Sequence, residues 1–149
     1  MSGNTNPIFS KVGKIGSTTL TAANVKSDGS GSIGTDMFLA FQADITNGSY
    51  VQKIRFIATA TAAATATTAT TLRIYISTVD TGAASSANTY LWSELSVPSV
   101  SADHSTNSTN YYEMPMGFAL PPDNTILVTT HLAPAASTAW RATVIGGDY

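Results

Sequence analysis

Apolar and polar side chains alternate with a two-residue period in several separate segments of this 149-residue chain. In residues 36–46, for example, Met37, Leu39 and Phe41 share one parity, whereas Gln42 stands on the other. Because successive side chains of a β-strand point to opposite faces, this pattern predicts a strand with one buried face. The same criterion predicts about eight strands, at residues 11–21, 36–46, 50–59, 71–77, 90–95, 111–120, 125–132 and 139–145.

Short stretches rich in Gly, Pro, Asn and Asp separate the expected strands, and these residue types favour turns. They lie at 24–34, 47–48, 80–88, 101–110, 121–124 and 134–137. Asn47-Gly48 is the strongest of these signals, because both residues tolerate the positive φ of a type I′ turn. We therefore expect a β-hairpin that joins residues 36–46 to residues 50–59.

No stretch carries a sustained apolar stripe of 3.6-residue period, so long helices are not expected. Eight short strands with loops of this spacing predict an all-β fold, an antiparallel β-sandwich. A jelly-roll-like topology is our first choice, and an immunoglobulin-like sandwich is the second. At this length we expect a single sandwich domain, residues 11–149, preceded by an N-terminal arm at residues 1–10.

The composition argues against several classes of function. Seven basic and nine acidic residues leave a formal net charge of −2, which offers no cationic field for nucleic acid. The absence of cysteine excludes disulfides, thiolate metal sites and cysteine nucleophiles. No apolar run reaches the length of a membrane span, and the first residues lack the features of a secretory signal. We expect a soluble protein with no cofactor and with neither nucleic acid nor membrane as a partner.

Residues 58–71 form a low-complexity tract of alanine and threonine without Gly, Pro or charge. Alternating Thr and Ala suits a sheet, so the tract could extend both flanking strands into a protruding ribbon. The composition fits a flexible surface loop equally well. Both alternatives stay open at this point.

Candidate catalytic and metal-binding residues are few. The two histidines, His104 and His131, lie far apart and belong to no metal-ligand motif, so we expect no metal site. The segment Asp103-His104-Ser105 has the residue types of a catalytic triad, but adjacent residues cannot line up nucleophile, base and orienting acid. We therefore expect a protein that is not an enzyme.

Residues 28–36 and the two glutamates are further candidates for ion binding and for catalysis. The segment 28–36, Asp-Gly-Ser-Gly-Ser-Ile-Gly-Thr-Asp, lacks the glutamate of an EF-hand loop and the lysine of a phosphate-binding loop, so we expect a flexible turn. Glu94 and Glu113 are the only glutamates, and nothing in the sequence pairs them as the acid and base of a glycosidase.

Aromatic side chains are the remaining candidates for ligand binding. A platform of them could bind a sugar, although aromatic residues on alternating strands are more typical of a core or an interface. The residues concerned are Tyr90, Trp92, Tyr111, Tyr112 and Trp140.

The C-terminal half contains three segments whose order resembles a known protein class. They are Leu91-Trp-Ser-Glu-Leu95, Gly117-Phe-Ala-Leu-Pro-Pro-Asp-Asn-Thr-Ile-Leu-Val-Thr-Thr130, and Trp140-Arg-Ala-Thr-Val-Ile-Gly-Gly-Asp-Tyr149. With Lys53-Ile-Arg-Phe56 and Leu72-Arg-Ile-Tyr-Ile76, this order is similar to small virion proteins of tailed bacteriophages, short chains that end in Gly-Gly-Asp-Tyr or a close variant. The resemblance spans roughly residues 37–149. It implies a phage structural protein with a jelly-roll-like sandwich, made in the bacterial cytoplasm.

From this resemblance we expect a capsid cement or decoration protein on the virion surface. Such a protein binds the major capsid protein, commonly as a homotrimer, and many copies oppose the pressure of packaged DNA. We expect the N-terminal arm to clamp a neighbouring subunit, with Pro7, Ile8, Phe9 and Lys11 as the contact residues.

Two other functions stay open. A tail, baseplate or fibre component would have the same composition and lack of catalytic residues. A carbohydrate-binding module would depend on the aromatic residues, so its glycan binding would be lost when Trp92 or Trp140 is replaced by alanine.

Overall fold

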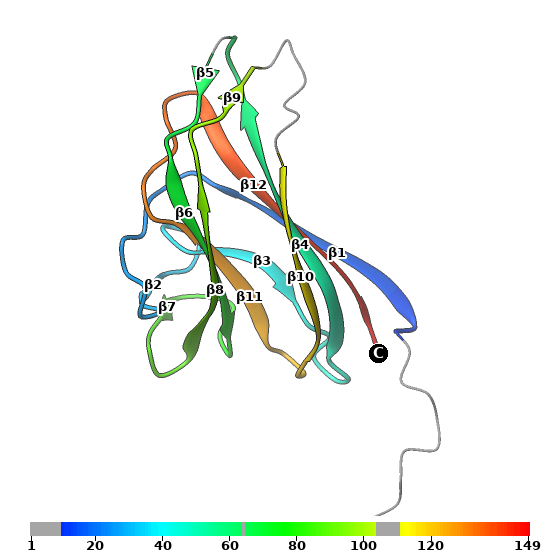
Figure 1. The fold of residues 1–149 in the computed structure, drawn as a ribbon. Helices are drawn as coiled ribbons and strands as arrows, with labels where there is room; N and C mark the ends of the chain where they lie inside the picture. The colour runs from blue at the N-terminus through cyan, green and yellow to red at the C-terminus, as the bar shows by residue number, and fades with distance from the viewer. Residues whose placement is uncertain (1–9, 64, 104–110) are drawn as a thin grey trace, which may run out of the picture.

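Eight long strands form two four-stranded antiparallel sheets in the computed structural model, which describes residues 10–63, 65–103 and 111–149. Sheet A has the order β1 (Val12–Leu20), β12 (Thr138–Asp148), β4 (Ser49–Ala60), β10 (Tyr111–Leu120). Sheet B has the order β3 (Phe38–Gln42), β11 (Thr125–Thr130), β6 (Thr70–Ser77), β8 (Thr89–Val97). Two short ladders pair β2 (Gly31–Ser32) with β7 (Ala83–Ala84), and β5 (Thr65–Ala66) with β9 (Ser101–Ala102). The two sheets lie face to face (Figure 1).

The pairing follows a simple rule along the chain. The first long strand pairs with the last, the second with the seventh, the third with the sixth and the fourth with the fifth. This is one long antiparallel hairpin, with its tip at residues 78–88, that has rolled up into two sheets. The predicted all-β sandwich with jelly-roll topology is confirmed, and each of the eight predicted strands is present. Among the described residues, no helix is long and apolar enough to cross a membrane.

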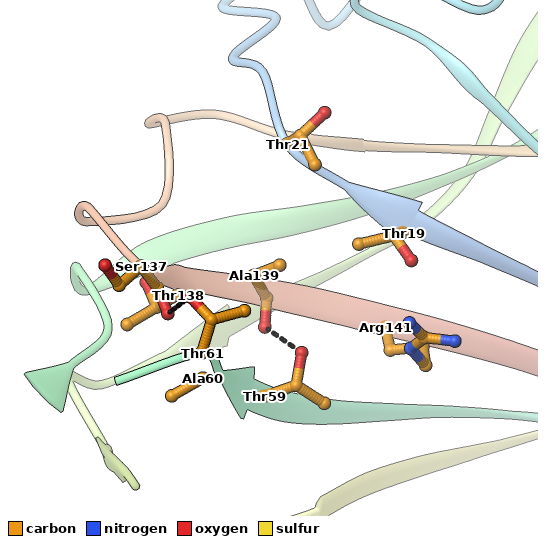
Figure 2. Close-up of a pocket in the computed structure, with 9 residues that line it drawn as sticks. All are labelled: Thr19, Thr21, Thr59, Ala60, Thr61, Ser137, Thr138, Ala139 and Arg141. Atoms are coloured by element: carbon orange, nitrogen blue, oxygen red, sulfur yellow. Dashed lines mark hydrogen bonds between the residues drawn. The ribbon is translucent and has the colours of Figure 1, made fainter. Parts of the chain in front are cut away.

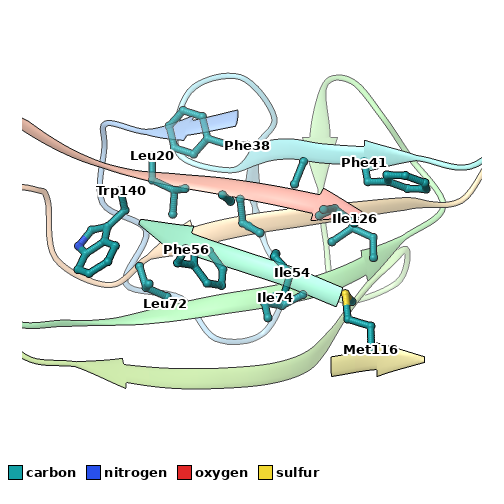
Figure 3. Close-up of a cluster of buried hydrophobic side chains, with 14 of the residues drawn as sticks. Leu20, Phe38, Phe41, Ile54, Phe56, Leu72, Ile74, Met116, Ile126 and Trp140 are labelled. Carbon is teal, nitrogen blue, oxygen red and sulfur yellow. The ribbon is translucent and has the colours of Figure 1, made fainter. Parts of the chain in front are cut away.

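The core fills the space between the inner faces of the two sheets (Figure 3). Sheet A contributes Phe56 and Trp140, and sheet B contributes Leu72 and Ile126, all with no exposed surface. Figure 3 shows Trp140 at one end of this cluster and Met116 at the other. The parity predicted from alternation is the parity of the core in β4, β6 and β12. The prediction is wrong in β3, where Phe38 and Ala40 face this core and Met37 and Leu39 pack on the opposite side of sheet B, because the pairing of β3 with β11 has a register shift.

The outer face of sheet B is covered by the chain itself. Arg73 points outward there and is only 7% exposed; its Nη1 donates to the carbonyl oxygen of Asn24 at 3.1 Å, and its Nε donates to Glu94 Oε1 at 2.6 Å. Beside it, the Tyr75 hydroxyl donates to the carbonyl oxygen of Lys26 at 3.0 Å, and burial raises the pKa of this phenol. A second small core on this side contains Met37, Tyr75, Ala84 and Leu127. The loop between β1 and β3 thus covers this face around Arg73 and Tyr75 on β6, whereas Leu91 on the edge strand β8 is 40% exposed.

The expected hairpin at Asn47-Gly48 is wrong. β3 and β4 lie in different sheets, so this turn carries the chain from sheet B to sheet A. The Asp44 carboxylate accepts hydrogen bonds from the amides of Thr46 (3.0 Å) and Asn47 (2.7 Å), and the Gly48 amide donates to the Asp44 carbonyl at 3.1 Å. Gly48 has φ of 77°, whereas Asn47 does not have positive φ. The Asn-Gly signal fits both a hairpin within one sheet and a turn between two sheets. The pairing of each strand with a distant partner decides between these two geometries.

The alanine and threonine tract forms neither a ribbon nor a free loop. β4 ends at Ala60, β6 begins at Thr70, and β5 between them pairs with β9. The buried hydroxyl of Thr67 accepts a hydrogen bond from the Val100 amide at 3.0 Å, and the Thr67 amide donates to the Val100 carbonyl at 2.9 Å. The tract therefore crosses from sheet A to sheet B while bound to residues 99–102.

The C-terminal Gly-Gly-Asp-Tyr segment holds three strands together at one end of sheet A. The Asp148 carboxylate accepts a hydrogen bond from the Ser49 hydroxyl and pairs with Lys14 Nζ at 3.2 Å. Its carbonyl oxygen accepts from the Lys11 amide at 2.7 Å. Gly146 lies against β4 so closely that an added Cβ would stand 2.3 Å from the carbonyl oxygen of Tyr50. The segment is thus a structural part of the central strand β12.

We predict that Gly146→Ala lowers the free energy of unfolding by about 1–3 kcal/mol, because the new methyl group forces β12 away from β4. Gly13→Ala is the matched control on the edge strand, where no atom lies within 4 Å of an added Cβ. It should change stability by no more than about 0.5 kcal/mol. Urea denaturation of the two variants measures both values, and equal losses would contradict this account.

Candidate functional site

The described chain leaves the outer face of sheet A uncovered. Its side chains form three rows across the four strands, in the order β1, β12, β4, β10. The rows are Ile15, Ile145, Lys53, Pro115; then Ser17, Thr143, Arg55, Glu113; then Thr19, Arg141, Ile57, Tyr111. None of these side chains is buried, in contrast to Arg73 and Tyr75 on the outer face of sheet B.

Large apolar side chains stand exposed on this face. Ile15 is 70% exposed and Tyr111 is 53% exposed. Tyr111 also lies under the Arg55 guanidinium, whose carbon is 4.6 Å from the ring centroid. Apolar groups in open solvent on a flat sheet are typical of a contact surface between proteins.

The charges on the face are mostly cationic. Glu113 pairs with Arg55 through Nε at 2.6 Å and with Lys53 through Nζ at 3.2 Å. These hydrogen bonds, first that from Arg55 and then that from Lys53, lower the pKa of the Glu113 carboxyl. Within the described ranges, Arg141 is exposed and forms no ion pair. Three cations against one carboxylate give the face a net positive charge.

Charge is distributed unevenly over the whole molecule as well. Sheet A and the residue that leads into it carry five of the seven basic residues and only two carboxylates, Glu113 and Asp148. The other seven carboxylates lie on sheet B and in the loops, together with Lys26 and Arg73. A net charge near zero therefore conceals a positive sheet and a negative remainder.

A shallow hollow of about 290 Å³ lies at one end of this face, between β1, β12 and β4 (Figure 2). Thr19, Thr59, Ala139 and Arg141 are among its lining residues. The Thr59 hydroxyl already donates to the Ala139 carbonyl at 3.3 Å, and the Thr138 hydroxyl donates to the Ala135 carbonyl at 2.7 Å. The residues that line the hollow are threonines, alanines, a serine and Arg141, with no His, Asp or Glu among them.

The residues considered for chemistry lie apart from one another. Glu94 is on β8 beside Arg73, and Glu113 is on β10, so the two glutamates occupy the outer faces of opposite sheets. His131 Nδ1 lies 3.3 Å from Arg73 Nη2, while His104 and Ser105 are outside the described residues. Within the described ranges, no three or more His, Asp or Glu side chains converge as metal ligands do.

The 28–36 segment is an ordered turn. Asp28 Oδ1 accepts hydrogen bonds from the Ser30 hydroxyl at 2.6 Å and the Ser30 amide at 2.9 Å, and these bonds lower the pKa of Asp28. The Ser32 amide donates to Asp36 Oδ1 at 2.6 Å. Each carboxylate thus binds its own loop backbone.

The aromatic residues form no common platform. Trp140 is fully buried, with its ring centroid 5.9 Å from that of Tyr112, and Trp92 packs on Phe118 at 5.5 Å. Only Tyr90 and Tyr111 are largely exposed, and they lie on β8 and β10 in different sheets. The role of Trp140 in glycan binding is therefore wrong, because this side chain reaches no surface.

The predicted partner-contact residues lie mostly outside the described part of the chain. Pro7, Ile8 and Phe9 are not described, whereas Lys11 is exposed immediately before β1. The prediction from the sequence missed the uncovered face itself. Its signal was present in Ile57 and Ile145, isoleucines that share the parity of Arg55 and Thr143 rather than the parity of the core.

Comparisons with known proteins give few similarities. No protein-family model matches the chain, and no curated protein matches it. Among solved structures, a chain of the cyanophage Pam1 capsid asymmetric unit is similar with a TM-score of 0.40 and 13% identity, over 99% of this chain and 94% of that one. A chain of infectious bursal disease virus, Gx strain, gives 0.29 and 10%, over 91% of this chain and 32% of that one. Dimeric latent PorU from Porphyromonas gingivalis gives 0.32 and 11%, over 99% of this chain and 14% of that one. Similarities at this level assign no function.

We predict that Glu113→Gln reduces the loss of stability on acidification. The folded-state pKa of Glu113 is lowered, so its stabilising effect is present at neutral pH and disappears as the pH falls through that lowered value. The natural chain should therefore lose more stability than the variant between about pH 5 and pH 3. Urea midpoints measured across this range test the prediction, and parallel curves for the two proteins would contradict it.

Proposed function

We propose that this chain is a bacteriophage virion structural protein, a capsid cement or decoration protein. It binds the outer surface of the shell and stabilises it by bridging major capsid subunits. It is located on the capsid surface and has no enzymatic activity. One observation carries the proposal: the fold covers part of one sheet with its own loop and leaves the other sheet uncovered, with Ile15 and Tyr111 exposed on it.

The order of segments in the C-terminal half supports the phage assignment. Its most specific element, Gly-Gly-Asp-Tyr, is the part of β12 that ties β1 and β4 together through Asp148. These contacts of Asp148 hold strands together, which is the role expected of a motif in a structural protein.

A protein of this kind acts through contact area repeated many times. A standard interface buries roughly 1,600 Å² in total. Modest contacts of that size, repeated at every subunit, stabilise a shell because the attached copies act together. A neutral molecule without cysteine or catalytic residues meets this requirement.

The N-terminal arm, residues 2–11, is proposed as the clamp on a neighbouring subunit. Pro7, Ile8 and Phe9 supply its apolar contacts, and Lys11 supplies a charge at its base. Lys11 donates its amide to Asp148 at 2.7 Å, so the arm leaves the body at the end of sheet A, beside the uncovered face.

We predict that the purified chain binds undecorated capsids of its phage with hundreds of copies per shell. Co-sedimentation followed by quantitation of bound protein measures this number, and tails of the same phage serve as the competing target. Binding to tails with no binding to shells would replace the cement function with that of a tail, baseplate or fibre component.

We also predict that the double variant Ile8→Ser, Phe9→Ser weakens shell binding at least tenfold, because two apolar side chains no longer leave water. Asn4→Ser is the matched control in the same segment and should bind normally. Limited proteolysis should cleave the arm more slowly on the shell than in free protein. Equal cleavage rates would remove the arm from the proposal.

A further inference from the structure

We propose that the uncovered face of sheet A binds the acidic end of a second copy of this chain, head to tail. This inference deepens the proposed function by naming the contact between copies. It concerns the free protein, so it can be tested without a shell.

The acidic end is formed by the turns at one end of the sandwich (Figure 1). Asp44 lies in the β3–β4 turn, Asp123 in the β10–β11 turn and Asp80 in the β6–β8 loop. Gln42 holds two of them together, because its Nε2 donates to Asp80 Oδ2 and to Asp123 Oδ1, each at 3.2 Å. The Asp123 amide donates to the Asp44 carbonyl at 3.3 Å.

An apolar residue projects from this acidic end. Ile45, next to Asp44, is 71% exposed, and the neighbouring Pro121 and Pro122 are exposed as well. The end therefore presents an apolar centre with carboxylates around it. This is the arrangement of a protein interface, an apolar core inside a polar rim.

The face of sheet A has the complementary arrangement. Ile57 and Tyr111 lie side by side in the third row, with Arg55 and Arg141 as their neighbours on adjacent strands. Arg141 has no carboxylate partner within the described chain, so an incoming Asp can pair with it without breaking an existing ion pair. Complementary potentials of this kind favour the correct partner and orientation.

Charge also disfavours a face-to-face dimer of two copies. Two identical faces related by a two-fold axis would place Lys53, Arg55 and Arg141 of one copy against the same cations of the other. Such like-charge contacts are unfavourable, so a face-to-face dimer is disfavoured. A head-to-tail contact avoids the repulsion, and it forms a closed ring when the rotation between copies closes.

The size of the face fits one such contact. Four strands about 4.8 Å apart and about ten residues long, at about 3.3 Å per residue, span on the order of 600 Å² in projection. A standard interface uses roughly 800 Å² of each partner's accessible surface, which exceeds the flat projection because side chains add relief.

The test uses three variants of the full chain. Arg141→Glu reverses a charge on the face, and Asp80→Asn combined with Ile45→Ser removes a charge and the apolar side chain from the acidic end, so the two altered surfaces do not complement each other. Lys26→Glu is the control, because it makes the same charge change at an exposed residue outside sheet A. Circular dichroism and thermal unfolding confirm that each variant folds.

Light scattering across a concentration series should show assemblies larger than a monomer for the natural chain and for Lys26→Glu. Each broken variant alone should have a dissociation constant at least tenfold higher. Mixed at equal concentrations, the two broken variants should form a one-to-one dimer that does not grow, because one supplies an intact end and the other an intact face. High salt should weaken all of these contacts.

Three outcomes would overturn the inference: a natural chain that stays monomeric at every concentration, broken variants that associate normally, or a mixture that forms no dimer. Shell binding is measured separately by co-sedimentation. Self-association without shell binding would remove the cement function and leave this contact in place, and shell binding by a strict monomer would do the reverse.

Discussion

The position of β12 between β1 and β4 is the constraint on which the rest of the structure depends. It brings the last strand of the chain beside the first, and it closes the rolled hairpin that defines the jelly roll. Its inward side chains, Trp140, Ala142 and Val144, are fully buried between the sheets. A strand with neighbours on both sides satisfies its backbone hydrogen-bonding groups along both edges. The pairing of β12 therefore fixes the order of the strands in sheet A. The close approach of Gly146 to Tyr50 and the hydrogen bonds of Asp148 secure the end of the same strand.

The two outer faces of the sandwich then differ because the connections differ. The loop between β1 and β3 is long enough to cross sheet B, where Arg73 and Tyr75 bind its carbonyl groups. Desolvation of the Arg73 guanidinium is offset by its contacts with Glu94 and Asn24, an arrangement typical of a buried cation. Sheet A receives no such cover from the described chain, so Ile15, Tyr111 and Arg141 on its outer face remain exposed.

The fold also separates the residues that could have formed a catalytic or metal site. Reactive residue types are present, yet the fold distributes them: Glu94 on one outer face, Glu113 on the other and Asp28 within its own turn. Each carboxylate has a nearby hydrogen-bond donor with which it forms a local, structural contact. Charges arranged in this way shape the surface potential of the molecule, and the positive sheet and negative loops are its main electrostatic feature.

Alternation along the sequence was enough to locate the strands and the inward faces of β4, β6 and β12, because a two-residue alternation is a local property of each strand. It did not give the inward face of β3, where a register shift against β11 lets both Phe38 and Phe41 join the core. The all-β class and the jelly-roll preference followed from the number and spacing of those strands. Only the tertiary structure decided which strands pair. The turn at Asn47-Gly48 serves a hairpin and a sheet-to-sheet corner equally well, and the long-range partners β11 and β12 select the corner. The structure also decided that Ile57 and Ile145 stay partly exposed, since a side chain's parity fixes its face and only the packing of distant loops fixes whether that face is covered.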